Sequence, residues 1–387
     1  ARIFEFEKIG QLLQQKAHET VMEINLDALT HNLNYFRGKL RSGTRVMAMV
    51  KAFSYGSGSH EIASVLRFHR VDYLAVAYAD EGVELRHAGI TLPIMVMSPE
   101  ARSLDTLLKY NLEPEIYNLH ILGLLEETMV RNVTSIQQEV RIHLKLDTGM
   151  HRLGFDEHEI PPLIERLKQN PGLRVQSVFS HLASSEDPGD DDFTLLQITR
   201  FESMSHLISG SLGYPVLRHL LNSAGISRFP AAQYDMVRLG IGLYGVGHNQ
   251  EEQRQLRNVS TLQSVITQIR HIPAGETVGY NRQGTTSRDT TIAVIPIGYA
   301  DGLDRRLGNG RGAVRIGDHQ APIIGNICMD LTMIDITDIP GAIREGTPVV
   351  IFDDRNPVST LAGTIGTIPY EVLTGISARV KRIYYYE

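Results

Sequence analysis

The sequence predicts a barrel of eight parallel strands surrounded by helices, the TIM-like (β/α)₈ fold, followed by a C-terminal all-β domain. A chain of 387 residues is too long for one ordinary core, so we expect two domains. Up to about residue 247, short apolar runs alternate with segments of helical spacing, which is typical of parallel strands joined by crossover helices. Beyond that point the apolar runs are β-branched and separated by turn residues, which indicates a β domain. We therefore expect a lead-in over residues 1–20, a barrel over 21–247 and a β domain over 248–387.

The first part of the chain holds nine candidate strands, one more than a closed barrel needs. We therefore assign the first, Val21–Leu26, to pairing with the second domain. A doubly wound open sheet is the competing architecture, but no Gly-x-Gly-x-x-Gly turn follows the first strand. The expected barrel strands are Val46–Val50, Tyr73–Ala77, Ile94–Met97, Glu113–Tyr117, Val140–Leu146, Arg174–Phe179, Leu217–Leu221 and Met236–Tyr244. The expected helices include Asp27–Leu40 with Asp27 as N-cap, Ser59–Phe68, Ala79–Ala88, Leu104–Tyr110, Pro161–Lys168 and Asp192–Ile208.

The second part of the chain contains short strand-like segments with few helical patterns between them. The polar stretch His248–Asn258 is the expected joint between the two domains. The expected strands are Leu262–Ile269, Thr291–Ile297, Ala313–Ile316, Ile323–Ile324, Thr332–Ile336 and Pro348–Phe352.

Composition and charge exclude several classes of protein. A net charge of -6 without a basic run argues against nucleic acid or an anionic membrane as the main partner. No apolar stretch is long enough to span a bilayer, and the first residues lack the features of a signal peptide. The single cysteine excludes an intramolecular disulfide framework. We therefore expect a cytoplasmic protein, and we assign no metal site.

Lys51 stands at the C-terminal end of the apolar run Val46–Val50, followed by a Gly/Ser-rich segment. Function in barrel enzymes is located at such strand ends. A lysine held against apolar surroundings has a lowered pKa and can act as a nucleophile or proton carrier. The alternative is a lysine that extends out of the strand end into solvent.

The other strand ends are also polar. Lys145 lies inside an apolar strand that runs into Arg152, and the next strand ends at His181. Ser223 follows the strand Leu217–Leu221, and Arg238 lies in the last barrel strand. Taken singly, His181 could be a core histidine and Asn222-Ser223 an ordinary helix N-cap. Together they place lysine, arginine, histidine and hydroxyl groups around the C-terminal opening of the predicted barrel.

The last strands also suggest a phosphate site. Ser223 and the amides of Gly240 and Ile241 follow late strands, where barrel enzymes commonly bind phosphate. A lysine that can form a Schiff base beside a phosphate cradle indicates pyridoxal 5′-phosphate as the cofactor.

Five motifs, in order across both parts of the chain, are similar to the signatures of bacterial alanine racemase. The likeness runs from about residue 20 to residue 387. The motifs are Val50-Lys51-Ala52-Phe53-Ser54-Tyr55-Gly56, Lys145-Leu146-Asp147-Thr148-Gly149-Met150-His151-Arg152-Leu153-Gly154, Val237-Arg238-Leu239-Gly240-Ile241, Ile295-Pro296-Ile297-Gly298-Tyr299-Ala300-Asp301-Gly302 and Ile327-Cys328-Met329-Asp330.

The resemblance implies a fold-type III pyridoxal phosphate enzyme that interconverts L- and D-alanine and supplies D-alanine for peptidoglycan. It implies a homodimer with active sites shared between the subunits. Lys51 would hold the cofactor and act as base on one face of the substrate, and Tyr280 of the partner subunit would act on the other face. A tyrosine base, which ordinarily titrates at about pH 10, needs a perturbing neighbour, and His181 beside Arg238 is the candidate.

The resemblance also implies roles for the remaining site residues. Arg238 would face the pyridine nitrogen without giving up a proton, which should suppress transamination. Arg152 would steer the cofactor's phenolic oxygen and the substrate carboxylate. Lys145 matches a lysine carbamylated in many members, where the new negative charge would orient Arg152. Tyr299 and Met329 of the partner subunit would line the substrate entry and bind the carboxylate, Met329 through its backbone. The phosphate cradle would consist of Tyr55, Ser223, Gly240, Ile241 and Tyr370.

Other interpretations of the same residues remain open at this point. Cys328 and Met329 could be packing residues, and Tyr299 a core aromatic. The sequence departs from the family pattern at Phe53-Ser54-Tyr55-Gly56-Ser57, where Asn-Ala-Tyr-Gly-His is common, and at His151, where glycine is common. Neither departure touches a residue assigned to chemistry.

The rival functions are a racemase of other or broader substrates such as serine and lysine, a fold-type III decarboxylase, a single-domain pyridoxal phosphate homeostasis protein and a non-catalytic binding protein. The second domain argues against the homeostasis protein, and several ionisable groups around one cavity argue against a non-catalytic role. The variant Lys-Ala-Phe-Ser-Tyr-Gly and the absent initiator methionine resemble the racemase half of fusions in which a Mur-type ligase precedes the racemase.

Overall fold

The computed structural model describes residues 17–132 and 139–387, so most of the lead-in expected over residues 1–20 lies outside the described part. The chain forms two compact units. Of the described residues, the barrel unit comprises 29–54, 58–132 and 139–257, and the C-terminal unit comprises 17–28, 55–57 and 258–387.

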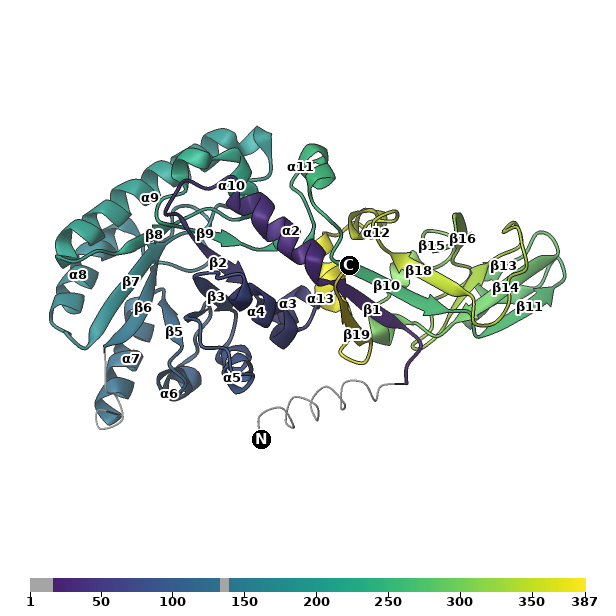
Figure 1. Ribbon diagram of the computed structural model, residues 1–387, viewed down its shortest axis with the longest axis horizontal. Coiled ribbons are helices and arrows are strands. Elements are labelled where there is room, and N and C mark those ends of the chain that lie inside the picture. The colour runs from purple at the N-terminus through teal and green to yellow at the C-terminus, as the bar shows by residue number, and fades with distance from the viewer. Residues whose placement is uncertain (1–16, 133–138) are drawn as a thin grey trace. The chain divides into compact units, whose positions relative to one another are not determined.

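The barrel unit is a closed ring of parallel strands in sequence order, β2 to β9, which confirms the predicted fold class. Helices follow the strands along the chain and lie outside the ring (Figure 1). The strands are β2 Arg45–Met49, β3 Tyr73–Val76, β4 Ile94–Val96, β5 Glu113–Ile116, β6 Val140–Lys145, β7 Leu173–Phe179, β8 Leu217–His219 and β9 Met236–Leu239.

Longer outer helices such as α4, α7 and α8 bury an apolar face, as their 3.6-residue spacing predicts. In α8 the buried side chains are Ile160, Leu163, Ile164 and Leu167, which share one face of the helix. The helices are α2 Leu26–Arg37, α3 Lys51–Tyr55, α4 Ser59–Phe68, α5 Ala79–His87, α6 Leu104–Lys109, α7 Leu119–Arg131, α8 Ile160–Lys168, α9 Asp191–Leu212, α10 Ser223–Arg228 and α11 Gln250–Gln255.

Strand register sets which side chains share the barrel interior. His143 of β6 pairs with Glu115 of β5 and with Ser177 of β7, and Lys145 pairs with Phe179. Because side chains alternate between the two faces of a strand, Lys145 lies on the same face as His143. The interior is therefore unusually polar, and its polar residues continue toward the C-terminal ends of the strands.

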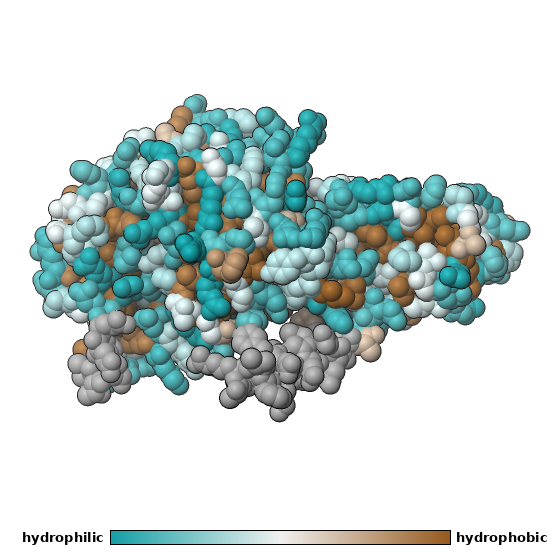
Figure 2. All heavy atoms as spheres, in the orientation of Figure 1, coloured by the Kyte–Doolittle hydropathy of each residue, from teal (hydrophilic) through white to brown (hydrophobic). Residues whose placement is uncertain are grey.

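The C-terminal unit consists mainly of antiparallel sheets, as predicted. One sheet has the order β16-β15-β18-β10-β1-β19, a second has the order β11-β14-β17, and β12 pairs with β13. In β1, Val21 pairs antiparallel with Gln263 of β10 and parallel with Lys381 of β19. Hydrophobic residues reach the surface among polar ones in this unit (Figure 2). Its elements are β1 Val21–Asn25, β10 Ser260–Val265, β11 Gln268–Ile272, β12 Thr277–Val278, β13 Gly284–Thr285, β14 Thr290–Ile295, β15 Ala313–Ile316, β16 His319–Pro322, β17 Thr332–Asp335, β18 Pro348–Phe352, α12 Val358–Ile365, α13 Pro369–Gly375 and β19 Lys381–Tyr385.

Several local predictions were wrong. Asn25, not Asp27, caps α2, because its Oδ1 accepts a hydrogen bond of 2.9 Å from the amide of Ala28. The expected strand 262–269 is divided between β10 and β11, and the expected joint 248–258 contains α11. The last barrel strand ends at Leu239, since residues 241–244 form a 3₁₀ turn.

None of the helices in the described ranges is both long and apolar enough to cross a membrane.

Candidate active site

Lys51 follows the end of β2 and is followed by a left-handed turn. The four residues Ala52 to Tyr55 all have φ between 50° and 55°. Left-handed backbone costs about 1–2 kcal/mol for each residue with a Cβ. The turn is fixed from outside, because the Ala52 amide donates a 2.6 Å hydrogen bond to Oε1 of Glu81, whose Oε2 accepts from the Ala77 amide at 2.7 Å. Strain held in this way is common at functional sites.

The ε-amine of Lys51 has a lowered pKa. Burial is the main cause, and the positive charge of Arg152 adds to it, while Glu81 and Glu115 act in the opposite direction. A lowered pKa increases the fraction of neutral amine at physiological pH, and the neutral amine is the nucleophilic form. This environment therefore favours a functional Lys51 over a lysine that extends freely into solvent.

Arg238 on β9 is almost completely buried, and its guanidinium is surrounded by acceptors. Nη1 lies 2.8 Å from Nδ1 of His219, and Nη2 donates to the carbonyls of Ser180 at 2.6 Å and Leu220 at 2.9 Å. Nη2 also lies 3.2 Å from Nδ1 of His181. Burial lowers the pKa of Arg238 to about 10, opposed by Glu115, so the side chain remains a cation at neutral pH.

A chain of hydrogen bonds continues from Arg238 through the barrel interior. His219 Nε2 lies 2.7 Å from the Ser177 hydroxyl, which lies 2.6 Å from Nδ1 of His143, whose Nε2 lies 2.8 Å from the Glu113 carboxylate. Because a guanidinium only donates, His219 must accept at Nδ1 and donate from Nε2. Ser177 then donates to His143, which donates to Glu113. Each step fixes the next tautomer and holds Arg238 in place.

Both histidines that contact Arg238 are held neutral. The pKa values of His181 and His219 lie well below the usual histidine range, because burial penalises the imidazolium and the nearby Arg238 charge repels it. His181 thus contacts Arg238, as the sequence suggested, and acts as an acceptor for it.

The loop after β6 carries Arg152, whose side chain is exposed. Asp147 fixes the loop by accepting 3.0 Å hydrogen bonds from the amides of Gly149 and His151 and by contacting Nδ1 of His151 at 2.9 Å. His151 has φ of 53°, in the left-handed region that glycine adopts easily. This backbone conformation explains why glycine is common at that position in the family that the sequence resembles.

Three of the predicted phosphate residues, Ser223, Gly240 and Ile241, meet at the ends of β8 and β9. The Ser223 hydroxyl accepts hydrogen bonds from the amides of Gly240 at 3.0 Å and Gly242 at 3.2 Å. Ile241 lies between these two glycines. A Cβ at Gly242 would come within 2.5 Å of the Phe36 ring, so only glycine permits this close packing. Asn222 is also a helix N-cap, since its Oδ1 accepts from the Gly225 amide at 2.9 Å.

In the C-terminal unit, one loop positions the three residues assigned to the partner's active site. The Asn326 side chain donates to the Tyr280 carbonyl at 3.1 Å, and the Tyr299 and Ala300 amides donate to the carbonyls of Cys328 and Met329, both at 3.0 Å. Tyr280, Tyr299 and Met329 are 67%, 43% and 53% exposed, so the packing interpretations of Tyr299 and Met329 are wrong.

Two other contacts shape this part of the C-terminal unit. A Cβ at Gly298 would lie 2.3 Å from the Met329 carbonyl oxygen, which explains the glycine in the Ile-Gly-Tyr motif. Tyr55 is buried and its ring centroid lies 5.8 Å from that of Tyr370, which is 42% exposed. These two tyrosines of the predicted phosphate cradle are therefore neighbours.

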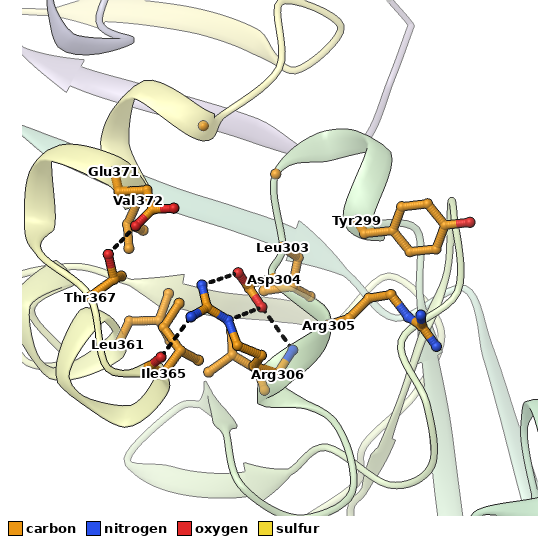
Figure 3. Close-up of a pocket in the computed structure, with 13 residues that line it drawn as sticks. Tyr299, Leu303, Asp304, Arg305, Arg306, Leu361, Ile365, Thr367, Glu371 and Val372 are labelled. Atoms are coloured by element: carbon orange, nitrogen blue, oxygen red, sulfur yellow. Dashed lines mark hydrogen bonds and ion pairs between the residues drawn. The ribbon is translucent and has the colours of Figure 1, made fainter.

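A pocket of ≈ 390 Å³ lies in the C-terminal unit (Figure 3). Of the predicted site residues it includes Tyr299, whose ring lies 5.9 Å from the Arg305 guanidinium. Arg306 is held by Asp304, with Nη2 2.7 Å from Oδ2, and by the Ile365 carbonyl at 2.9 Å (Figure 3). The pocket thus has two arginines, Arg306 fixed by Asp304 and Arg305 beside the exposed ring of Tyr299.

Sequence reasoning missed several interior residues of the barrel. They could have been found from the two-residue alternation of side chains along a strand, because polar residues occur at alternate positions of otherwise apolar strands. The missed residues are Glu113, Glu115, His143, Ser177 and His219.

The residues present fit pyridoxal 5′-phosphate. An anionic cofactor with an aldehyde requires an amine of lowered pKa and compensating positive charge, which Lys51 and Arg238 provide. The Ser223 hydroxyl lies beside the amides of Gly240 and Gly242, and hydroxyl and amide groups of this kind suit a phosphate group.

Comparisons with known proteins identify the family. Residues 24–248 match the family model "Alanine racemase, N-terminal domain", and residues 259–384 match "Alanine racemase, C-terminal domain". Alanine racemase of Sorangium cellulosum is 37% identical over 381 residues, covering 94% of this chain and 98% of that protein.

Solved structures show the same similarity. Alanine racemase of Clostridium difficile 630 superposes with a TM-score of 0.88 and 33% identity, covering 95% of this chain and 96% of the other. Alanine racemase of Bartonella henselae with covalently bound pyridoxal phosphate gives a TM-score of 0.84 and 28% identity, covering 95% and 99%. The chain belongs to the alanine racemase family.

Proposed function

We propose that this chain is a pyridoxal 5′-phosphate-dependent enzyme that interconverts L-alanine and D-alanine by a two-base mechanism and supplies D-alanine for peptidoglycan. The observation that carries the proposal is the combination, on neighbouring strands, of Lys51 with its lowered pKa and Arg238 as a fixed cation. The covalently bound pyridoxal phosphate of the Bartonella henselae relative supports the cofactor.

Pyridoxal phosphate, when bound, supplies an electron-withdrawing ring that acidifies the α-proton of the attached amino acid. Lys51 binds the cofactor through its neutral amine and then moves a proton at Cα on one face. Tyr280 moves a proton at Cα on the opposite face from its phenolic oxygen. Two groups are needed because racemisation removes a proton from one side and returns one to the other, which a single fixed group does poorly.

The remaining residues bind and orient. Arg238 would contact the cofactor ring and would keep its proton, because its charge is stabilised by the acceptors around it. Arg152 orients the substrate carboxylate, with Tyr299 and the Met329 backbone at the entry. The phosphate would be held by Tyr55, Ser223, Gly240, Ile241 and Tyr370.

We propose that two copies of the chain share each active site, with Lys51 from one subunit and Tyr280 from the other. Support comes from the exposure of Tyr280, Tyr299, Met329 and Leu331, which are presented from neighbouring loops of the C-terminal unit. Exposed apolar side chains gathered in this way are typical of a surface that another protein covers.

The direct test is conversion of L-alanine to D-alanine by the purified, cofactor-loaded protein, followed by circular dichroism. Lys51→Ala should lower kcat/KM at least about 10³-fold, and Tyr280→Phe about 10²–10⁴-fold, as expected for loss of acid–base groups. Tyr386→Phe is the matched control, since Tyr386 is 66% exposed and Tyr280 is 67% exposed. Full activity of Lys51→Ala would remove the mechanism.

Substrate breadth and reaction type are tested in the same assay. Alanine is the expected substrate, and L-serine and L-lysine should react more slowly, although one methylene or hydroxyl discriminates by only about 1–3 kcal/mol. Release of carbon dioxide from any of these amino acids, without racemisation, would favour the decarboxylase. A preceding Mur-type ligase domain stays a prediction, which the intact mass of the native gene product tests against the 43.2 kDa of this chain.

A further inference from the structure

Glu115 is a buried acid that the reaction outlined above does not use. It lies on β5 and is 1% exposed. It pairs in register with His143 of β6, so Lys145, two residues further along β6, lies on the same interior face. Within the described part of the chain, Oε1 of Glu115 is buried without a hydrogen-bond partner. A buried carboxylate oxygen without a partner is costly and calls for a nearby compensating charge.

Four positively charged side chains act electrostatically on Glu115 and favour its ionised form. In order of their effect on Glu115 they are Lys145, Arg238, Arg152 and Lys51. Lys145 and Arg238 flank the same ring, since Lys145 Nζ lies 4.4 Å and the Arg238 guanidinium 5.2 Å from the centroid of Phe179. Lys145 and Arg238 are 5% and 2% exposed, so without an anion the site would hold uncompensated buried positive charge.

The other buried acid on β5 is already engaged. Glu113 accepts from His143 Nε2 at 2.8 Å, and its other oxygen lies 3.6 Å from the Arg141 guanidinium. Glu113 thus completes the hydrogen-bond chain from Arg238, whereas Glu115 faces the cations. The two acids, two residues apart on one strand, have separate roles.

Lys145 and Glu115 depend on each other electrostatically. Burial lowers the pKa of Lys145, and Glu115 is the charge that raises it. Burial raises the pKa of Glu115, and Lys145 is the charge that lowers it most. Each group therefore favours the ionised form of the other against the cost of burial.

We propose that Glu115 is the counter-anion of the barrel mouth: it keeps Lys145 as a free ammonium group rather than a carbamate, and its own negative charge positions Arg152. The role of Arg152 rests on the proposed function, but the state of Lys145 does not. Glu115 is a positioning residue, since it acts through Lys145 and Arg152.

Carbamylation would conflict with this arrangement for two reasons. Carbon dioxide adds only to a neutral amine, forming an N–C bond and releasing one proton, and Glu115 favours the protonated amine. The product would also replace a positive charge with a negative one on the same interior face as Glu115, placing two anions together in a buried site. The negative charge that a carbamate would supply is already present in Glu115.

The first experiment uses the wild-type protein equilibrated with ¹³C-bicarbonate. We expect no carbamate resonance in the ¹³C NMR spectrum. A carbamate resonance that disappears in Lys145→Met would overturn the proposal. This measurement needs no Glu115 variant and no racemase activity, so its result is independent of the proposed function.

The second experiment titrates the Lys145 side chain by ¹⁵N NMR in Glu115→Gln and in the control Glu113→Gln. Glu115→Gln should weaken protonation of Lys145 about tenfold or more, because the compensating charge is lost while the side-chain shape is kept. Glu113→Gln should leave it unchanged. An unchanged titration in Glu115→Gln, or an equal change in both variants, would show that Glu115 does not compensate Lys145. In the racemase assay Glu115→Gln should lower kcat/KM about 10-fold or more.

Discussion

Removing one hydroxyl group from the barrel interior, by Ser177→Ala, should destabilise the protein far more than the loss of one atom suggests. Ser177 is fully buried and joins two imidazoles, with its oxygen 2.7 Å from His219 Nε2 and 2.6 Å from His143 Nδ1. The substitution leaves one donor and one acceptor without partners. Each buried polar group left in this way costs about 1–3 kcal/mol. The free energy of unfolding should therefore fall by about 2–6 kcal/mol.

Ser205→Ala is the matched control. Ser205 is also fully buried, but its hydroxyl makes one longer hydrogen bond, 3.3 Å to the Glu202 carbonyl of its own helix. Its replacement should cost less than about 1 kcal/mol, since no buried partner loses its only hydrogen bond.

The assay is urea unfolding of the cofactor-free protein at one protein concentration. Circular dichroism is the appropriate signal because the sequence contains no tryptophan. A stability loss in Ser177→Ala no larger than that in Ser205→Ala would refute the hydrogen-bond chain from Arg238 to Glu113.

Two further predictions follow from the local environment of single residues. His181 and His219 should stay neutral between about pH 5.5 and 8 in NMR titrations, since burial and Arg238 hold their pKa values well below the usual range. Because the unfolded chain gains those protons near pH 6.5 and the folded chain does not, each histidine should lower the unfolding free energy by about 1.4 kcal/mol per pH unit below that point. A titration midpoint near 6.5 for either would contradict this. Ala52→Gly should raise the unfolding free energy by about 0.5–1 kcal/mol, since Ala52 has φ of 52° and ψ of 54°. A decrease in the urea midpoint would show that the left-handed turn is not strained.

The barrel could be predicted from the sequence because its strands are continuous apolar runs bounded by turn residues. Where an apolar run does not mark the end of an element, the predicted end of that element was wrong. The expected strand Met236–Tyr244 ends early because Gly240 has φ of -111° and ψ of -113°, which is not a strand conformation. The helix 250–255 was missed although Asn249 caps it, with Oδ1 2.8 Å from the Glu252 amide, which is a signal visible in the sequence.

The candidate site was predictable where a residue stands at a strand end, as Lys51 does. The acid Glu115 was not, because its importance depends on pairing with His143 and on the position of Lys145 across the register. Register is set by the closure of the whole barrel, which the local sequence does not reveal. The resemblance to alanine racemases supplied the proposed roles of Tyr280 and Tyr299. From the residue pattern alone, they would be aromatic residues of the surface or the core.

The central claim, that an amine and a phenol from different subunits complete each active site, is tested most directly by mixing two inactive variants. Lys51→Ala and Tyr280→Phe, co-expressed with different tags, each lack one group. In a hybrid dimer one site carries both substitutions and the other site is intact. Random pairing makes half of the dimers hybrids, each with one of two sites intact, so the mixture should regain about a quarter of wild-type activity and the purified hybrid about half. If the purified hybrid converts L-alanine no faster than either variant alone, the two groups belong to one subunit's site or to none.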